Sequence, residues 1–144
     1  MTVRVVYGSQ TGNTRRVAQA IAETVACAAE PAAEAVPSSA ADLIFLGGAV
    51  YATHDNGILP ELTRFIETLD PAKVRKAALF RTGFSDAALD LMAALLARRG
   101  IPVAEERFGC KGRFLVFNLG HPNARDLADA REFAARVAGK EARA

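Results

Sequence analysis

The chain reads Ser9-Gln10-Thr11-Gly12-Asn13-Thr14 directly after a short β-branched run at residues 3–7. Apolar residues then recur from residue 17 to residue 25 with the i, i+4 spacing of a helix. The hydroxyl-rich stretch therefore lies between the carboxyl end of a strand and the N-terminus of a helix. Unpaired backbone N–H groups and the positive end of the helix dipole meet there, and both favour binding of a phosphate.

The side chains of this loop add hydrogen-bond donors without adding charge. Ser9, Thr11 and Thr14 supply hydroxyls, Asn13 supplies an amide, and Gly12 allows close approach or a positive φ. The loop is no Walker motif, because no lysine follows its glycine in register, and it is no G-x-G-x-x-G motif. We expect neutral dipoles to hold a phosphate here. The structural alternative is an ordinary turn in which Asn13 or Thr14 caps the helix.

Strand-like segments alternate with helix-like segments along the rest of the chain. Apolar runs at residues 43–47 and 77–80 predict buried strands. A short edge strand is expected near residues 34–36, and the last strand is expected in two pieces, at residues 103–108 and 114–117. The alternation predicts an α/β fold, with a parallel sheet that is covered by helices on both faces.

Three further helices are predicted from apolar periodicity, at residues 59–69, 89–96 and 127–137. Asp86 is expected to cap the second of these helices, and Gly100 and Pro102 are expected to end it. Asn123 or Pro122 is expected to open the third. A length of 144 residues predicts one domain over residues 1–144, with a frayed tail from residue 139.

The segment from Tyr7 to Thr14 resembles the phosphate loop of flavodoxins, a [ST]-x-T-G-x-T pattern that holds the phosphate of FMN. The segment follows the first strand, in a chain of flavodoxin size. The resemblance implies a flavodoxin-like, doubly wound five-stranded parallel sheet of order 2-1-3-4-5 and noncovalently bound FMN. In this strand order the ligand crevice lies where the order reverses, between strands one and three, a rule for which flavodoxins are a standard example.

The resemblance also implies that two loops hold the flavin ring, one after the third strand and one after the fourth. Their residues are Gly48, Ala49, Val50, Tyr51 and Ala52 in the first ring loop, and Thr82, Gly83, Phe84 and Ser85 in the second. Tyr51 and Phe84 are expected to stack on the ring, with the small residues Gly47, Gly48 and Ala49 leaving room beside Tyr51. The alternative is that both aromatic residues only cover the end of the sheet.

The chain departs from classical flavodoxins in its ring loops and its charge. Classical members offer a tryptophan, a tyrosine and several acidic residues there, whereas this chain has no tryptophan and has Arg81 before the second ring loop. Carboxylates disfavour the anionic, fully reduced flavin, and arginines favour it. We therefore expect the last reduction step to have a less negative potential than in acidic flavodoxins.

Positive charge is concentrated in the second half of the chain. Residues 1–72 hold four basic and eight acidic side chains, whereas residues 73–144 hold fourteen basic and eight acidic ones. We expect a basic surface that docks an acidic redox partner protein, the alternative being scattered solvated cations. No nucleic-acid motif, membrane span or signal peptide is visible, so we expect neither nucleic acid nor membrane as a partner. A cytoplasmic monomer is favoured.

The cysteines and histidines show no metal-ligand spacing, so no metal is expected. Cys27 is expected to extend the first helix as a small filler, and a disulfide with Cys110 is not expected. Cys110 is interpreted as a structural cysteine, with a reactive thiol as the alternative. His121 is interpreted as a turn residue before a helix, or as a contact for a partner.

Three functions remain open from the sequence. The first is an FMN-binding electron-transfer protein without catalytic side chains of its own. The second is a flavin-dependent reductase, or reductase subunit, that acts on a quinone or a tetrapyrrole. It is suggested by residues 108–114 and 120–127, which are similar to a branch of short flavodoxin-like proteins that donate electrons to anaerobic reductases. The third is a flavodoxin-fold interaction or activator protein.

Overall fold

The structure is a computed structural model that describes residues 1–113 and 118–144. Its strands form one parallel sheet in the order β2-β1-β3-β4-β5, which confirms the predicted class and strand order. The strands are β1 (Val3–Tyr7), β2 (Ala29–Pro31), β3 (Ala41–Gly48), β4 (Val74–Thr82) and β5 (Phe108–Cys110).

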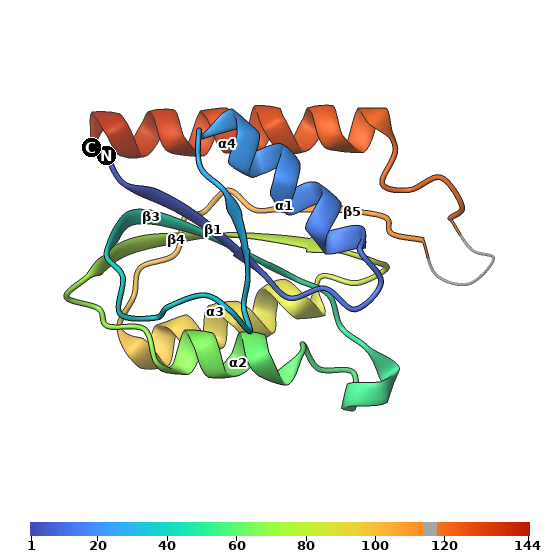
Figure 1. Cartoon of the computed structure of the whole chain (residues 1–144), viewed down its shortest axis with the longest axis horizontal. Helices are drawn as coiled ribbons and strands as arrows, with labels where there is room; N and C mark the ends of the chain where they lie inside the picture. Colours follow the sequence, from blue (N-terminus) through green and yellow to red (C-terminus); the bar gives the residue numbers. More distant parts are fainter. Residues whose placement is uncertain (114–117) are drawn as a thin grey trace.

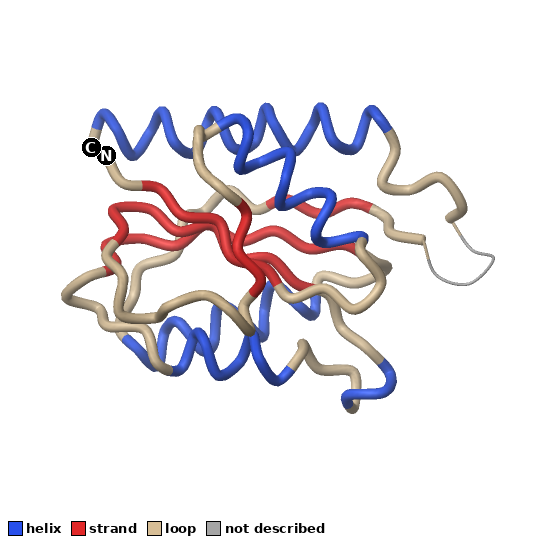
Figure 2. The backbone as a smooth tube through the Cα atoms, in the orientation of Figure 1, coloured by secondary structure: helices blue, strands red, loops and turns tan. Residues whose placement is uncertain are grey.

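Helices cover both faces of the sheet (Figures 1 and 2). One face carries α1 (Asn13–Thr24) and α4 (Ala124–Arg143), which pack against each other, and the other carries α2 (Pro60–Glu67) and α3 (Ala87–Arg99). A short 3-10 helix, η1 (Ala52–His54), follows β3. The layers are those expected of a sheet whose parallel strands are joined by helical crossovers.

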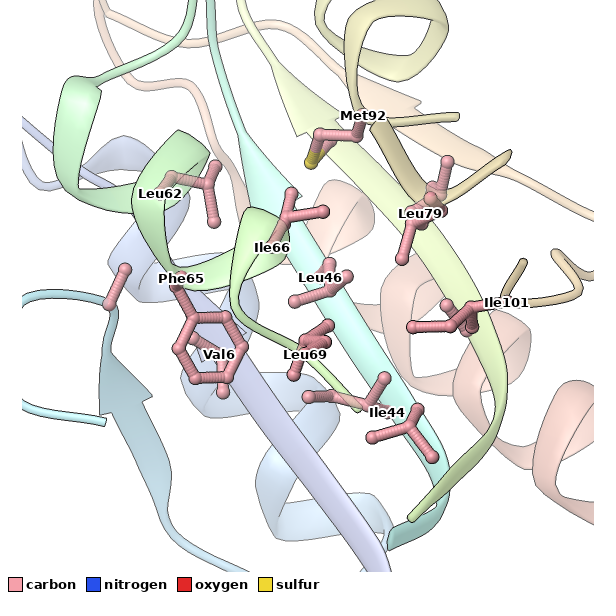
Figure 3. Close-up of a cluster of buried hydrophobic side chains, with 14 of the residues drawn as sticks. Val6, Ile44, Leu46, Leu62, Phe65, Ile66, Leu69, Leu79, Met92 and Ile101 are labelled. Carbon is pink, nitrogen blue, oxygen red and sulfur yellow. The ribbon is translucent and has the colours of Figure 1, made fainter. Parts of the chain in front are cut away.

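The central strand β3 divides the interior into two cores. Leu43 and Phe45 point toward α1 and α4, whereas Ile44 and Leu46 point toward α2 and α3. Figure 3 shows the second core, in which Ile44 and Leu46 meet side chains of both helices. Because neighbouring side chains of a strand point to opposite faces, a strand covered on both faces must be apolar throughout. That requirement explains the unbroken apolar run of this segment.

The edge strand does not lie where it was predicted. β2 spans Ala29–Pro31, and Tyr7 pairs with Pro31. Residues 34–36, predicted as the strand, instead belong to a turn in which the Ala35 amide donates to the Pro31 carbonyl over 3.0 Å. Pro31 is tolerated as the last residue of an edge strand, where its missing N–H removes no ladder bond.

The last strand overlaps its first predicted piece, residues 103–108, only at Phe108, because β5 spans Phe108–Cys110. β5 begins at Phe108, and Val103 makes only an isolated bridge with Ala77. The second predicted piece, residues 114–117, lies outside the described residues. The preceding strand, β4, is in turn longer than the predicted 77–80, because both of its ends pair with β3.

Several helix ends follow the predicted signals. Gly100 ends α3 with a φ of +72°, and Asn123 opens α4 through a reciprocal capping box with Asp126. The expected frayed tail is helical instead, because α4 continues to Arg143. An ion pair of 3.0 Å between Lys76 and Glu141 ties its last turns to β4.

Candidate functional site

The loops that follow β1, β3 and β4 gather at one end of the sheet, together with the segment after β5 (Figure 1). They enclose a cleft of about 380 Å³. Most of the predicted site residues line this cleft. They are Gln10, Thr11, Asn13, Ala49, Val50, Tyr51, Ala52, Thr82, Gly83, Phe84 and Ser85.

Four predicted site residues do not line the cleft. Ser9 and Gly12 line a neighbouring hollow on the β2 side of the same loop. Thr14 is fully buried beneath the cleft, and Gly48 is buried against Leu62. These four residues therefore influence the shape of the cleft through their backbone and their packing, without lining it.

The loop after β1 is held in shape by its own side chains. The Gly12 amide donates to Ser9 Oγ over 3.0 Å. The Asn13 side-chain amide donates both to Thr11 Oγ1, over 3.0 Å, and to the Arg113 carbonyl, over 2.8 Å. The Thr11 hydroxyl accepts in this contact, so its own hydrogen is left to donate to a ligand.

The N-terminus of α1 has no side-chain cap. Its N-cap is Gly12, with a φ of +88°, so the alternative in which Asn13 or Thr14 caps the helix is wrong. The first turn holds no acidic residue, and the earliest amide bonded within the helix is that of Arg16, which donates to the Gly12 carbonyl over 3.1 Å. The amides of residues 13–15 donate to no described residue, so they can donate to an anion placed at the loop.

Beneath the loop, a buried hydroxyl pair joins α1 to the end of β4. Thr14 Oγ1 and Thr82 Oγ1 share a hydrogen bond of 2.8 Å, and both side chains are almost wholly buried. This bond fixes the start of α1 against the last residue of the strand. The loop after β1 and the second ring loop are thereby held at a fixed spacing.

Tyr51 connects the first ring loop with the loop after β1. Its backbone amide donates to the Gly57 carbonyl over 3.0 Å, closing a tight loop around η1. Its phenol oxygen accepts from the Gln10 amide over 3.1 Å. Burial raises the pKa of the Tyr51 phenol, which therefore keeps its proton at neutral pH and can also donate.

The expected room beside Tyr51 does not come from the two glycines. β3 extends through both, so they sit in regular strand geometry and face the layers above and below the sheet. A Cβ on Gly47 would clash with the Phe80 ring, and one on Gly48 would lie 2.8 Å from Leu62 Cδ2. The missing side chains of the two glycines leave room for core side chains, for Phe80 at Gly47 and for Leu62 at Gly48.

The second ring loop is anchored by a guanidinium that turns away from the cleft. Arg81 donates to Asp86 Oδ1 over 2.9 Å, to the Gly83 carbonyl over 2.7 Å and to the Cys110 carbonyl over 3.1 Å. Asp86 occupies the N-cap position of α3, as predicted, but its side chain binds Arg81 and makes no capping bond. Phe84, at the tip of the loop, is 65% exposed.

The chemistry of the cleft fits a phosphorylated planar ring system. The lining combines neutral donors, from Thr11 and the N-terminus of α1, with apolar surface of Val50 and Tyr51. No carboxylate lines the cleft in the described part of the chain. The neutral donors favour a dianionic phosphate, and the apolar surface favours an apolar ring. FMN combines the two.

A family model described as a flavodoxin domain matches residues 4–91. The chain belongs to the flavodoxin family. It is therefore an FMN-binding electron-transfer protein, and it shares with other flavodoxins the property of acting with redox partners. A comparison with curated protein sequences gives no significant match.

Solved structures of flavodoxins share this fold over nearly the whole chain. A flavodoxin from the domain Archaea is 22% identical, with a TM-score of 0.80, and the match covers 98% of this chain and 99% of that one. Oxidised flavodoxin 1 from Bacillus cereus is 21% identical, with a TM-score of 0.69, covering 94% and 95%. A short-chain flavodoxin associated with a PDU bacterial microcompartment is 14% identical, with a TM-score of 0.73, covering 98% and 99%.

The cleft of this flavodoxin also contains residues outside the predicted set. Thr53 and Asn56 come from the turn after β3, and Gly112 and Arg113 from the segment after β5. A Cβ on Gly112 would lie 2.7 Å from Asn13 Nδ2, so this glycine lets the β5 segment approach the phosphate loop. The rule that parallel strands present their carboxyl ends together points to this segment as well.

Cys110 and His121 of this flavodoxin both interact with the Asp126 carboxylate. Burial, reinforced by the Asp126 carboxylate, raises the pKa of the Cys110 thiol to about 12, which favours the structural interpretation over a reactive thiol. His121 Nδ1 lies 2.6 Å from Asp126 Oδ2 in the turn before α4. Cys27 is free, like Cys110, but it lies beyond the end of α1 instead of extending it.

Two classes of site are not found in residues 1–113 and 118–144. No group of three or more histidine, cysteine or acidic side chains is placed to hold a metal ion. None of the helices in that part of the chain is both long enough and apolar enough to cross a membrane.

Proposed function

We propose that FMN binds in the cleft, with its phosphate at residues 9–14 and its ring between the two ring loops. The uncapped N-terminus of α1, which opens on the cleft beside the Thr11 hydroxyl, is the observation that supports this orientation most. Bound there, FMN supplies the electron-accepting and electron-donating chemistry. The apolar side chains of Val50, Tyr51 and Phe84 exclude water from the ring.

The residues of the phosphate loop divide into ligands and supports. Thr11 and the first amides of α1 donate directly, while Ser9 and Asn13 hold the loop in shape through their own hydrogen bonds. Thr14 acts from beneath, through its buried bond to Thr82. The Gln10 amide donates to the Tyr51 phenol oxygen and thereby ties the phosphate loop to the first ring loop.

We propose that the protein is a carrier that passes electrons to and from a separate oxidoreductase. Among the described lining residues only Tyr51 and Arg113 are titratable, and no histidine, cysteine or carboxylate is among them. The protein therefore contributes binding, orientation and tuning of the flavin. The two free cysteines support our expectation of a cytoplasmic setting, where thiols stay reduced.

The acidic character expected of the partner has support in the basic side chains around the cleft. Arg15, Arg16, Lys111 and Arg113 are exposed at this end of the molecule, and none makes an ion pair with a described residue. Complementary charge chiefly raises the rate of encounter and selects the partner.

An FMN titration with a visible spectrum tests the site. We expect stoichiometric binding that quenches FMN fluorescence and shifts the flavin absorption bands. A protein that stays colourless with added FMN contradicts the proposal and supports the interaction-protein alternative. Consumption of NAD(P)H by the protein alone, with a quinone as acceptor, would favour the reductase alternative, whereas a requirement for a separate reductase supports the carrier.

A further inference from the structure

A second, strongly basic hollow adjoins the FMN cleft. It has a volume of about 460 Å³ and lies on the α1 side of the phosphate loop. Its lining residues are Thr11, Gly12, Asn13, Arg15, Arg16, Gln19, Arg113, Gly120 and His121. Three guanidiniums therefore face one space, and no carboxylate lines it in the described part of the chain. The His121 imidazole also lines the hollow, but it is bound to the Asp126 carboxylate and adds no uncompensated charge.

The position of two of these cations is unfavourable for the isolated protein. Arg15 and Arg16 stand in the first turn of α1, where the helix dipole is already positive, and the first turn holds no acidic residue. Both side chains are exposed, and neither pairs with an acidic side chain within residues 1–113 or 118–144. By contrast, Arg4 and Arg81 on the strands are each paired with a carboxylate. The hollow thus presents uncompensated charge.

We infer that this hollow is the docking site for a cluster of carboxylates on the redox partner. Guanidinium groups bind carboxylates in a bidentate geometry, and several of them converging on one space select a surface with several acidic side chains. Leu119, next to the lining residue Gly120, is 61% exposed, and Phe84 stands exposed at the cleft. Charge beside exposed apolar side chains is the composition of a protein interface, which favours a protein over a free anion.

The placement also gives the docked partner access to the cofactor. Thr11, Asn13 and Arg113 line both the hollow and the cleft, so the two share a wall. A partner anchored in the hollow lies directly beside the proposed FMN site. The inference rests on the proposed function for its purpose, but the binding of carboxylates can be measured independently of FMN.

The test compares two double variants that change net charge equally. Arg15→Gln/Arg16→Gln removes two cations of the hollow, and Arg64→Gln/Arg98→Gln removes two exposed cations from α2 and α3 on the other face of the sheet. A fluorescein-labelled hexaglutamate peptide is titrated with each protein at low salt, and its anisotropy gives the dissociation constant. We expect binding about fivefold weaker for the first variant and within about twofold of the wild type for the second.

Additional measurements distinguish a carboxylate-docking site from attraction to net charge and from a small-anion site. Equal weakening by both double variants would show attraction to net charge alone and overturn the inference. Inorganic phosphate is then added to the FMN-loaded protein, in which FMN already occupies the phosphate loop. Displacement of the peptide by phosphate at concentrations far below those needed for glutamate would mark a small-anion site and would also overturn the inference. Thermal melts check folding, and the hollow variant is expected to be at least as stable as the wild type, since it loses repulsion at the helix terminus. FMN titrations run in parallel, so a failure of FMN binding is seen separately from a failure of docking.

Discussion

Thr11 and Thr14 carry the same hydroxyl in the same short loop, yet the fold gives them different surroundings. Thr11 is exposed at the cleft and accepts a hydrogen bond from Asn13, which leaves its hydrogen for a ligand. Thr14 is wholly buried and bonds Thr82. Removing each hydroxyl should therefore change a different property of the protein.

Thr11→Ala should weaken FMN binding by about 1–3 kcal/mol, because a hydroxyl bond to a charged phosphate is lost. The free energy of unfolding of the FMN-free protein should barely change. Fluorescence titration gives the first quantity and urea unfolding the second. Thr63→Ala, on α2 and away from the cleft, serves as the control. An unchanged FMN affinity would show that Thr11 does not bind the FMN phosphate.

Thr14→Val should instead lower the stability of the FMN-free protein by about 1–3 kcal/mol. The substitution keeps the shape of the side chain but leaves the buried Thr82 hydroxyl without its partner. Urea unfolding measures the loss. A variant as stable as the wild type would show that the pair contributes nothing to holding α1 against β4.

Cys110 predicts a loss of stability at alkaline pH. Its folded pKa of about 12 exceeds the ordinary value of 9.0, so the folded state holds the proton more tightly than the unfolded state. The contribution is fully present below pH 9.0 and declines as the pH rises toward 12, by at most roughly 1.4 kcal/mol per pH unit. Lysines and tyrosines also titrate in this range, so the free energy of unfolding is measured for both the wild type and Cys110→Ala. The variant should lose less stability than the wild type between pH 9.0 and 12.

At the scale of elements, the short edge strand β2 is positioned by an ion pair. Arg4, on β1, is buried and donates to both carboxylate oxygens of Glu30, over 3.0 and 2.8 Å, while its guanidinium lies 5.7 Å from the centre of the Phe65 ring. A strand of three residues offers few ladder bonds, so this contact helps fix its register.

Arg4→Leu should lower the free energy of unfolding by about 2–3 kcal/mol, because Glu30 then loses its partner in a partly buried place. Adding Glu30→Leu should recover part of that loss, which a double-mutant cycle with urea unfolding measures. If the single variant lost under about 0.5 kcal/mol, the pair would rank as an ordinary surface salt bridge.

At the scale of the whole molecule, the end that carries the cleft differs electrostatically from that of an acidic flavodoxin. Among the described residues that line the cleft, Arg113 carries a charge. The exposed cations Arg15, Arg16 and Lys111 lie near the cleft. Positive charge stabilises an anionic reduced flavin. The absence of carboxylates among the described lining residues thus agrees with the potential expected from the sequence.

Arg113→Gln should make the potential of the last reduction step more negative, on the order of tens of millivolts. A spectroscopic redox titration measures it, with Arg64→Gln on the far face as the control. The wild type should have a less negative potential than acidic flavodoxins under the same conditions. An equally low wild-type potential, or an equal shift in both variants, would contradict this electrostatic effect.

The sequence predicted the elements of the fold more accurately than their ends. Apolar runs found β3 and β4, and Gly100 and Asn123 marked helix ends, because these signals act within a few residues. β2 was placed too late in the chain, because its register depends on Arg4, a residue far away in sequence. The last turns of α4 also make a contact with a residue far away in sequence, the ion pair of Glu141 with Lys76 on β4.

By itself, the sequence indicated an α/β fold through its periodicity. Its local motif carried the resemblance that implied the family, the order of the strands and the loops that meet at the cleft. Only the tertiary structure decided what each loop residue does. It buried Thr14, turned Arg81 away from the cleft and brought Arg113 into it. Burial and hydrogen-bond partners arise between segments distant in the chain, and no local pattern of residues specifies them. The phosphate loop was therefore visible in six residues, while its supports and its basic neighbour appeared only once the chain was folded.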